Sequence, residues 1–288
     1  MPITIPAAFE TLHSWLTPST TESTSAASHR ASIKACLENS FGMTNFFRSG
    51  SFGHGTSISG YSDVDYMAVL PRSKLSSNSS TTLQKVRDAL VYRFPRTAVS
   101  IRSPAVVVPF GNKISERHEI TPADYMGKTN GSSVYEIPNR YGEWMTTSPH
   151  AHGEWINSIN LRNPGTKALI RFIKLWNYKR EGGIRSFYLE MRVAQYAANE
   201  SYISYPVDVW RALNFLRNKE LAAMKDPTGL CGSFYPCSDA MKSQALSKLD
   251  TAIARAERAY KNDQAGNVFN AFEDYGLLFN GHFPRWGY

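Results

Sequence analysis

The hydrophobic periodicity of the chain changes near residue 149, and this change constrains the fold more than any other feature. Before it, helical spacings alternate with short apolar runs, which predicts a mixed unit of helices and strands. After it, Ala168, Leu169, Phe172, Ile173 and Trp176 begin a series of helical stripes that continues to about residue 261. The pattern predicts an α+β unit over residues 1–148 and an all-helical unit over residues 149–288.

Within the first unit, the predicted elements follow from spacing and turn residues. Helices are expected at residues 5–16, 33–41 and 83–94, strands at residues 64–70, 98–101, 105–110 and 117–121, and polar loops at residues 17–28 and 76–82. In the second unit, helical stripes are expected through residues 184–199, 205–224 and 239–261.

Composition narrows the classes of protein that the chain can belong to. Its 288 residues are 42% hydrophobic, which is enough for a buried core and excludes a wholly disordered chain. The three cysteines form no closely spaced pair, which favours free thiols in a reducing compartment and not structural zinc. No secretory leader or membrane-spanning run is evident, so a cytoplasmic protein is expected. The net charge of +8 favours polyanionic partners such as nucleotides.

Residues 50–65 carry the strongest chemical signal. Asp63 and Asp65 are two positions apart at the start of the expected strand, so their carboxyl groups should lie on the same face. Two carboxylates this close repel each other unless a cation neutralises them, and Mg²⁺ prefers oxygen ligands. Gly50 and Ser51 supply a turn whose backbone N–H groups can approach a triphosphate.

Together, the Gly-Ser turn, the Asp-Val-Asp segment and the apolar strand resemble the signature of polymerase-β-like nucleotidyltransferases. The resemblance implies a third carboxylate, and the segment His118-Glu119-Ile120-Thr121-Pro122-Ala123 nominates Glu119, with Glu116 and Asp124 as alternatives. It also implies two Mg²⁺ ions, or Mn²⁺, held by Asp63, Asp65 and Glu119. Glu119 holds a position where relatives more often carry Asp.

The second half resembles bacterial cGAS/DncV-like nucleotidyltransferases through residues 169–177, residues 184–190, the Asp226-Pro227-Thr228-Gly229 run and the terminal Phe283-Pro284. The resemblance implies a bilobal fold with a nucleotide cleft. It assigns triphosphate contacts to Gly50, Ser51, Lys174 and Ser186, and base stacking to Phe187 or Tyr188. Helical spacing alone favours different roles for two of these residues. By that interpretation, Phe187 packs in the core, and Lys174 lies at the edge of the apolar stripe with its charged group in water.

The histidines receive structural interpretations. His54, within the glycine segment, is expected to face solvent, and four others show no ligand spacing and are interpreted as surface or core residues: His13, His29, His150 and His152.

The resemblance implies that the chain condenses NTPs into a cyclic di- or trinucleotide second messenger with release of pyrophosphate, in antiphage defence of the CBASS type. The implied partners are NTP substrates, a cyclic-nucleotide-responsive effector and an optional activator or accessory protein. A monomer that requires neither nucleic acid nor a membrane is expected. Two alternatives stay open: a nucleotidyltransferase that makes linear oligonucleotides or modifies RNA, a protein or a small molecule, and an inactive nucleotide-binding sensor.

Overall fold

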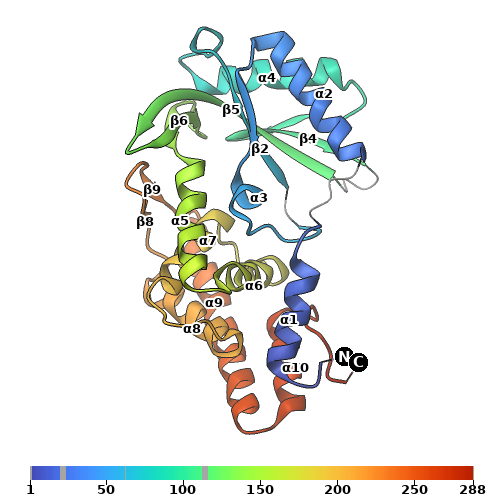
Figure 1. The fold of residues 1–288 in the computed structure, drawn as a ribbon, viewed down its shortest axis with the longest axis vertical. Coiled ribbons are helices and arrows are strands. Elements are labelled where there is room, and N and C mark those ends of the chain that lie inside the picture. Colours follow the sequence, from blue (N-terminus) through green and yellow to red (C-terminus); the bar gives the residue numbers. More distant parts are fainter. Residues whose placement is uncertain (1, 20–23, 62, 112–115, 288) are drawn as a thin grey trace.

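The computed structural model describes residues 2–19, 24–61, 63–111 and 116–287. The molecule is elongated, with a β-sheet and two covering helices at one end and a group of helices at the other (Figure 1). Among the helices of the described residues, none combines the length and the apolar character needed to cross a bilayer.

The sheet contains seven strands within the described residues. They are β1 (Asn45–Arg48), β2 (Val64–Val69), β3 (Ser100–Arg102), β4 (Ala105–Phe110), β5 (Glu116–Thr129), β6 (Ser132–Pro138) and β7 (Trp144–Thr147). The main order is β1-β2-β5-β4-β3, and β6 pairs with the later part of β5 and with β7. The β2 and β5 strands run parallel, whereas the other pairs are antiparallel.

Side chains of β2 alternate between two apolar clusters on the two faces of the sheet. Tyr66 and Ala68 pack with α2 (Thr24–Phe41) and α4 (Ser79–Arg93), which cover one face. Met67 and Val69 belong to a smaller cluster on the opposite face. Asp65 is two residues before Met67, so its carboxyl group emerges on the face that α2 and α4 leave open.

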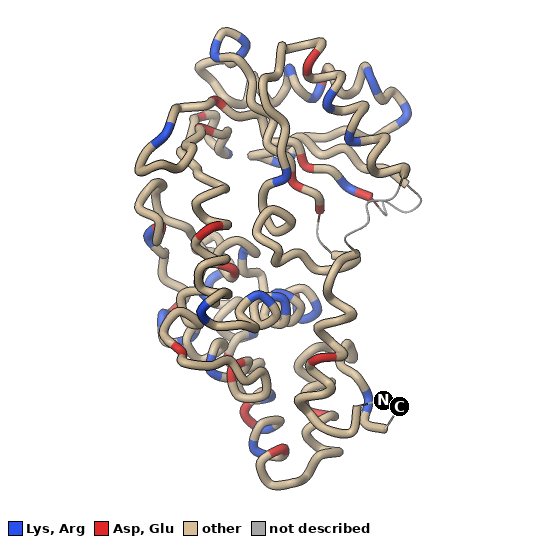
Figure 2. The backbone as a smooth tube through the Cα atoms, in the orientation of Figure 1, with Lys and Arg blue, Asp and Glu red and all other residues tan. Residues whose placement is uncertain are grey.

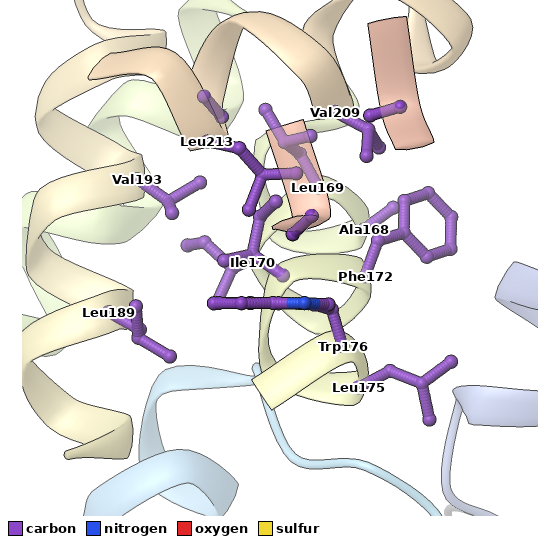
Figure 3. Packing of buried hydrophobic residues seen from close by; sticks show 14 of the residues in the cluster. Ala168, Leu169, Ile170, Phe172, Leu175, Trp176, Leu189, Val193, Val209 and Leu213 are labelled. Carbon is purple, nitrogen blue, oxygen red and sulfur yellow. The ribbon is translucent and has the colours of Figure 1, made fainter. Parts of the chain in front are cut away.

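The second half is built from helices, with α6 at its centre. These are α5 (Pro149–Arg162), α6 (Thr166–Lys179), α7 (Ser186–Ala197), α8 (Tyr205–Asn218), α9 (Asp239–Gln264) and α10 (Val268–Leu278). Every residue of α6 from Ala168 to Trp176 is buried. Figure 3 shows Leu169, Ile170 and Trp176 among side chains of α7 and α8. A helix that is surrounded on all sides must bury its charged residues as well, and α6 buries Arg171 and Lys174.

The first helix, α1 (Ile5–Leu16), is distant in sequence from the helices that it contacts. Its buried residues Phe9 and Leu12 belong to the apolar cluster of the second half, and the helix packs against α6, α8 and α10. The two ends of the chain lie side by side, since Gly287 N donates a hydrogen bond to Pro2 O at 3.3 Å. The sequence boundary at residue 148 groups α1 with the sheet, whereas its contacts are with the helices.

The α+β fold class is confirmed, and several element boundaries differ from the sequence expectations. The two expected loops were too long: α2 begins at Thr24 and α4 at Ser79, where the Asn78 side chain accepts a hydrogen bond from Ser80 N. Residues 20–23 of the first loop lie outside the described residues. The first residues of α2 and α4 are rich in serine and threonine. These residues favour both loops and helix N-termini, so the sequence alone does not distinguish the two.

Further differences concern short elements. The segment that starts at Gly50 forms a helical turn, α3 (Gly50–His54), and a 3₁₀ turn at Arg72–Lys74 follows β2. Strands β1, β6 and β7 have no counterpart among the expected elements. A hairpin of β8 (Met224–Lys225) and β9 (Ser233–Phe234) interrupts the otherwise helical second half.

Candidate active site

Three carboxyl groups meet at the start of the parallel strand pair. In the β2–β5 ladder, Asp65 lies directly beside Glu119, so their side chains leave the same face of the sheet. Asp63 comes two residues before Asp65, and its charge acts on the carboxyl groups of both Asp65 and Glu119. The topology therefore assembles Asp63, Asp65 and Glu119 as the sequence predicts.

Burial and mutual repulsion favour the protonated forms of Asp65 and Glu119. Burial, followed by the charges of Glu119, Asp63 and Glu190, raises the pKa of Asp65 to about 8. The pKa of Glu119 is also raised, first by burial and then by Asp63. Such a cluster of oxygen ligands fits a divalent cation, which would remove the repulsion between them.

Two arginines that the sequence analysis did not single out partly neutralise the cluster. Arg117 Nη2 lies 2.9 Å from Glu119 Oε1, and Arg117 Nε lies 3.5 Å from Asp63 Oδ1. Arg102 Nη1 lies 3.7 Å from the same Glu119 oxygen. Arg117 is two residues before Glu119 on β5, so period-two spacing could have placed it on the carboxylate face.

The alternative third carboxylates point to other partners. Glu116 Oε1 interacts with His118 Nε2 at 2.5 Å and with His29 Nδ1 at 3.1 Å. Asp124 is buried and forms an ion pair of 2.6 Å with Arg72. Geometry therefore favours Glu119 over Glu116 and Asp124.

Gly50 allows α3 to lie against Asp65. Its φ is +54°, and a Cβ atom at this position would lie 2.1 Å from Asp65 Oδ2. The preceding Ser49 N donates a hydrogen bond of 2.9 Å to Asp65 O. Gly50 and Ser51 thus occupy the first turn of a helix whose start is fixed beside the carboxylate cluster.

Gly50→Ala is expected to lower turnover at least about 100-fold, because displacing a catalytic group by about 1 Å has an effect of this size. The matched control is Gly60→Ala, which has a similar φ of +76° but nothing within 4 Å of its added Cβ atom. Steady-state kinetics and melting temperatures of both variants measure the difference. Equal losses in the two variants would show that left-handed backbone strain, and not contact with Asp65, is responsible.

Buried cations of α6 hold the loop that follows α3. Arg171 donates hydrogen bonds to Ser57 O and Gly55 O at 3.0 and 2.8 Å. Lys174 Nζ donates to Thr56 O at 3.0 Å and to Glu190 Oε1 at 2.6 Å. Figure 2 shows the acidic strand ends above the basic residues of α6. These contacts fit a role of Lys174 in holding the loop, and its direct contact with a phosphate stays a prediction.

Glu190 connects Lys174 to α3. His54 Nδ1 donates to Glu190 Oε2 at 3.0 Å, and both side chains are 3% exposed. Burial alone would raise the pKa of Glu190, but Lys174 and His54 outweigh it and lower that pKa to about 2. The expectation that His54 faces solvent is therefore wrong, because its ring is buried and contacts Glu190 of the second half. The sequence did contain one indication of this contact, because Glu190 is an acidic residue within a largely apolar helix.

Tyr178, near the end of α6, lies close to the carboxylates. Burial of its hydroxyl group, followed by the nearby charges of Asp63 and Asp65, raises the pKa of Tyr178. Ser186 begins α7 near Tyr178, and its contact with a triphosphate stays a prediction. The Tyr178 ring lies 5.6 Å from that of Tyr61, which precedes the carboxylates. Tyr178 was not recognised from the sequence, because it follows the apolar stripe of α6 without any motif.

The two residues nominated for base stacking, Phe187 and Tyr188, differ in how far they are buried. Tyr188 is 1% exposed and donates to Ala222 O at 2.7 Å, so its nomination as a stacking residue is wrong. Phe187 is half-buried and contacts His152 and Phe234 edge to face at 5.3 and 4.8 Å. Base stacking by Phe187 stays a prediction.

A mixed sheet that presents three carboxylates beside a glycine turn, faced by a helical half, defines a polymerase-β-like nucleotidyltransferase. The family model described as the Second Messenger Oligonucleotide or Dinucleotide Synthetase domain matches residues 3–160. The chain belongs to this family, which is of the cGAS/DncV-like kind, and it is a nucleotidyltransferase.

Solved structures share the fold over nearly the whole chain at low sequence identity. CdnC of Escherichia coli MS115-1, in complex with HORMA-deltaN, has a TM-score of 0.69 and 17% identity, covering 96% of this chain and 98% of its own. CdnG of Bradyrhizobium diazoefficiens, in complex with GTP, has a TM-score of 0.71 and 13% identity, with coverages of 96% and 97%.

CdnE cyclic dinucleotide synthase of Elizabethkingia meningoseptica, with GTP and Apcpp, has a TM-score of 0.66 and 19% identity, with coverages of 84% and 96%. A search of curated proteins found no match to the chain.

Proposed function

We propose that this nucleotidyltransferase condenses NTPs into a cyclic di- or trinucleotide second messenger with release of pyrophosphate. The observation that carries the proposal is the convergence of Asp63, Asp65 and Glu119 beside Gly50. The family description and the CdnE cyclic dinucleotide synthase support the choice of a nucleotide as both donor and acceptor. The cyclic AMP-GMP synthase DncV of Vibrio cholerae, solved with a linear intermediate, supports a stepwise route.

The donor set fits a pair of divalent cations, for which we propose Mg²⁺, with Mn²⁺ as a substitute. Three carboxyl groups at the start of the parallel strand pair, with the pKa of Asp65 raised to about 8, are the oxygen-rich environment that hard cations prefer. Asp63, Asp65 and Glu119 would hold the ions. Ions bound there would lower the pKa of the attacking hydroxyl and neutralise the charge of the departing pyrophosphate.

The residues of the chain would then orient the reactants. Gly50 and Ser51 let the backbone of α3 approach the triphosphate, while Lys174 keeps the loop after α3 in place. A ribose hydroxyl of one nucleotide attacks the α-phosphorus of another, an oxygen–phosphorus bond forms, and the bond to pyrophosphate breaks. The hydroxyl proton passes to a carboxylate of the cluster, for which we propose Glu119. A second transfer within the linear product closes the ring.

The biological setting is part of the same proposal. A cytoplasmic role in antiphage defence, with a downstream effector that responds to the product, would explain why the product is cyclic. The HORMA-deltaN complex of the related CdnC supports an accessory protein as a partner. We further propose a monomer with two lobes, one formed by the sheet and its covering helices and the other by α1 together with residues 149–288.

The test is to incubate the purified protein with all four NTPs and Mg²⁺ or Mn²⁺, treat the mixture with phosphatase, and identify resistant products by mass spectrometry. We expect a cyclic product whose yield falls at least about 10³-fold in Asp63→Ala, because the loss removes part of the charge stabilisation at phosphorus. Asp88→Ala, at an exposed site on α4, is the matched control and should retain wild-type yield.

Each other outcome identifies a different function. Linear oligonucleotides alone would contradict cyclisation and favour a different acceptor. Bound NTP without release of pyrophosphate, even when a HORMA-type partner is added, would favour a nucleotide sensor.

A further inference from the structure

A second group of ligand-type side chains lies away from the carboxylate cluster, where α5 meets the β8–β9 hairpin. It consists of His152 from the first turns of α5, and of Asp226 and Cys231 from the loop between the two strands. One potential ligand atom of each side chain lies within 4.8 Å of the others. The side chains of His152 and Asp226 are 2% and 0% exposed, and Cys231 is half-buried.

The distances within this group match those between the ligands of a tetrahedral metal ion. His152 Nε2 lies 3.3 Å from Asp226 Oδ1 and 3.7 Å from Cys231 Sγ. Zinc bonds of about 2.0–2.1 Å to nitrogen or oxygen and about 2.3 Å to sulfur place tetrahedral ligand atoms roughly 3.3–3.6 Å apart. A thiol, an imidazole and a carboxylate are all zinc ligands.

The loop holds its ligands in place through its own hydrogen bonds. Asp226 Oδ2 accepts from Thr228 Oγ1, Leu230 N and Cys231 N at 2.6, 3.1 and 2.9 Å. Outer hydrogen bonds of this kind orient a metal-binding carboxylate and carry Cys231 toward His152. On the other side, edge-to-face contacts with Phe187 and Phe234, at 5.3 and 5.5 Å, fix the imidazole ring.

We propose that His152, Asp226 and Cys231 bind one Zn²⁺ ion that joins α5 to the β8–β9 loop. A water molecule would complete the four ligands, and the half-buried Cys231 leaves a path for the ion to enter. The sequence spacing gave no indication of this site, because 74 positions separate the histidine from the aspartate. The site is independent of the carboxylate cluster, whose ligands are all oxygen atoms and suit Mg²⁺.

Three measurements on the wild-type protein test the proposal. Protein from zinc-supplemented cultures, purified without chelators, should contain one zinc per chain by elemental analysis. X-ray absorption at the zinc edge should show one sulfur at about 2.3 Å and lighter ligands at about 2.0–2.1 Å. After removal of the metal, titration with Co²⁺ should produce a thiolate-to-cobalt absorption band that saturates at one equivalent.

Matched variants identify the ligands. Cys231→Ser should abolish the thiolate band and weaken metal binding by more than the roughly 10- to 100-fold that loss of an outer-shell partner causes. Cys237→Ser, which changes another half-buried thiol, should keep both band and affinity. Repeating the titration with Asp63→Ala separates any Co²⁺ held by the carboxylate cluster, which contributes no thiolate band.

The proposal is overturned if supplemented wild-type protein contains only substoichiometric zinc and excess Co²⁺ gives no thiolate band. That result would identify the group as a hydrogen-bonded contact without metal. A thiolate band that persists in Cys231→Ser and disappears in Cys237→Ser would overturn the ligand assignment. Because these readouts need no NTP, they are unaffected if the cyclase proposal fails.

Discussion

Asp65→Asn is expected to abolish turnover and at the same time to raise the melting temperature of the metal-free protein at pH 8. The pKa of Asp65 is raised to about 8 by burial and by the charges of Glu119 and Asp63. Between about pH 4 and pH 8 the native state therefore holds a proton that the unfolded chain has released. Stability from this group falls as the pH rises through that window, and asparagine carries no charge to cause the loss.

Thermal unfolding at several pH values, with and without Mg²⁺, measures this effect. Without metal, the asparagine variant should exceed wild type at pH 8 by at least about 3 °C, the shift that roughly 1 kcal/mol produces in a protein of this size. The difference should vanish near pH 4. Mg²⁺ should stabilise wild type more than the variant, because a ligand stabilises the state that binds it.

The surface variant Asp88→Asn serves as the control and should leave the pH profile unchanged. A stability gain in Asp65→Asn that is equal at pH 4 and pH 8 would show that crowding of carboxylates is not its source. Retention of wild-type turnover by Asp65→Asn would remove this residue from the catalytic cluster.

Lys174→Met is expected to destabilise the protein by about 3–5 kcal/mol, since it leaves the buried charge of Glu190 without its cation. Lys174 and Glu190 are 1% and 3% exposed and their charged groups are 2.6 Å apart. Adding Glu190→Gln should restore part of this loss, because neither charge is then left unpaired. Denaturant unfolding of the four proteins gives the coupling energy directly.

Turnover should fall in both single variants, because the pair holds the loop after α3 and contacts His54. The matched control is Lys261→Met, which breaks the exposed pair with Glu257 on α9 and should change stability by less than about 1 kcal/mol. Additive effects of Lys174→Met and Glu190→Gln would contradict a coupled buried pair.

The carboxylate cluster could be predicted because it depends on local pattern and one strand pairing. Asp63 and Asp65 share a face by the period of a strand, and the resemblance of the segment 118–123 to a family strand end nominated Glu119 on the neighbouring strand. The turn at Gly50 could also be predicted, because glycine favours such a turn, but the spacing of the residues does not show that the segment forms the helix α3. Only the parallel pairing of β2 with β5 distinguishes Glu119 from Glu116 and Asp124.

The contacts between the two halves could not be predicted, because they join residues far apart in the chain. His54 and Glu190 meet across 136 positions, and Arg171 reaches Gly55 across 116. Sequence periodicity identifies α6 as amphipathic, but a helix surrounded on every side also buries its polar stripe. The same limit explains why Tyr188 was assigned the wrong role. Its aromatic ring and hydroxyl group are equally suited to contact with a ligand and to packing in the core.

The contacts of α1 make the helical half discontinuous in sequence, with the whole sheet inserted between α1 and α5. During synthesis from the N-terminus, α1 is made before the sheet, and its partners α6, α8 and α10 are made only after it. The apolar face of α1, including Phe9 and Leu12, must therefore wait for α10 before it is fully covered. The order of synthesis thus lets the sheet fold as a unit, whereas the helical half completes its core only when α10 is available.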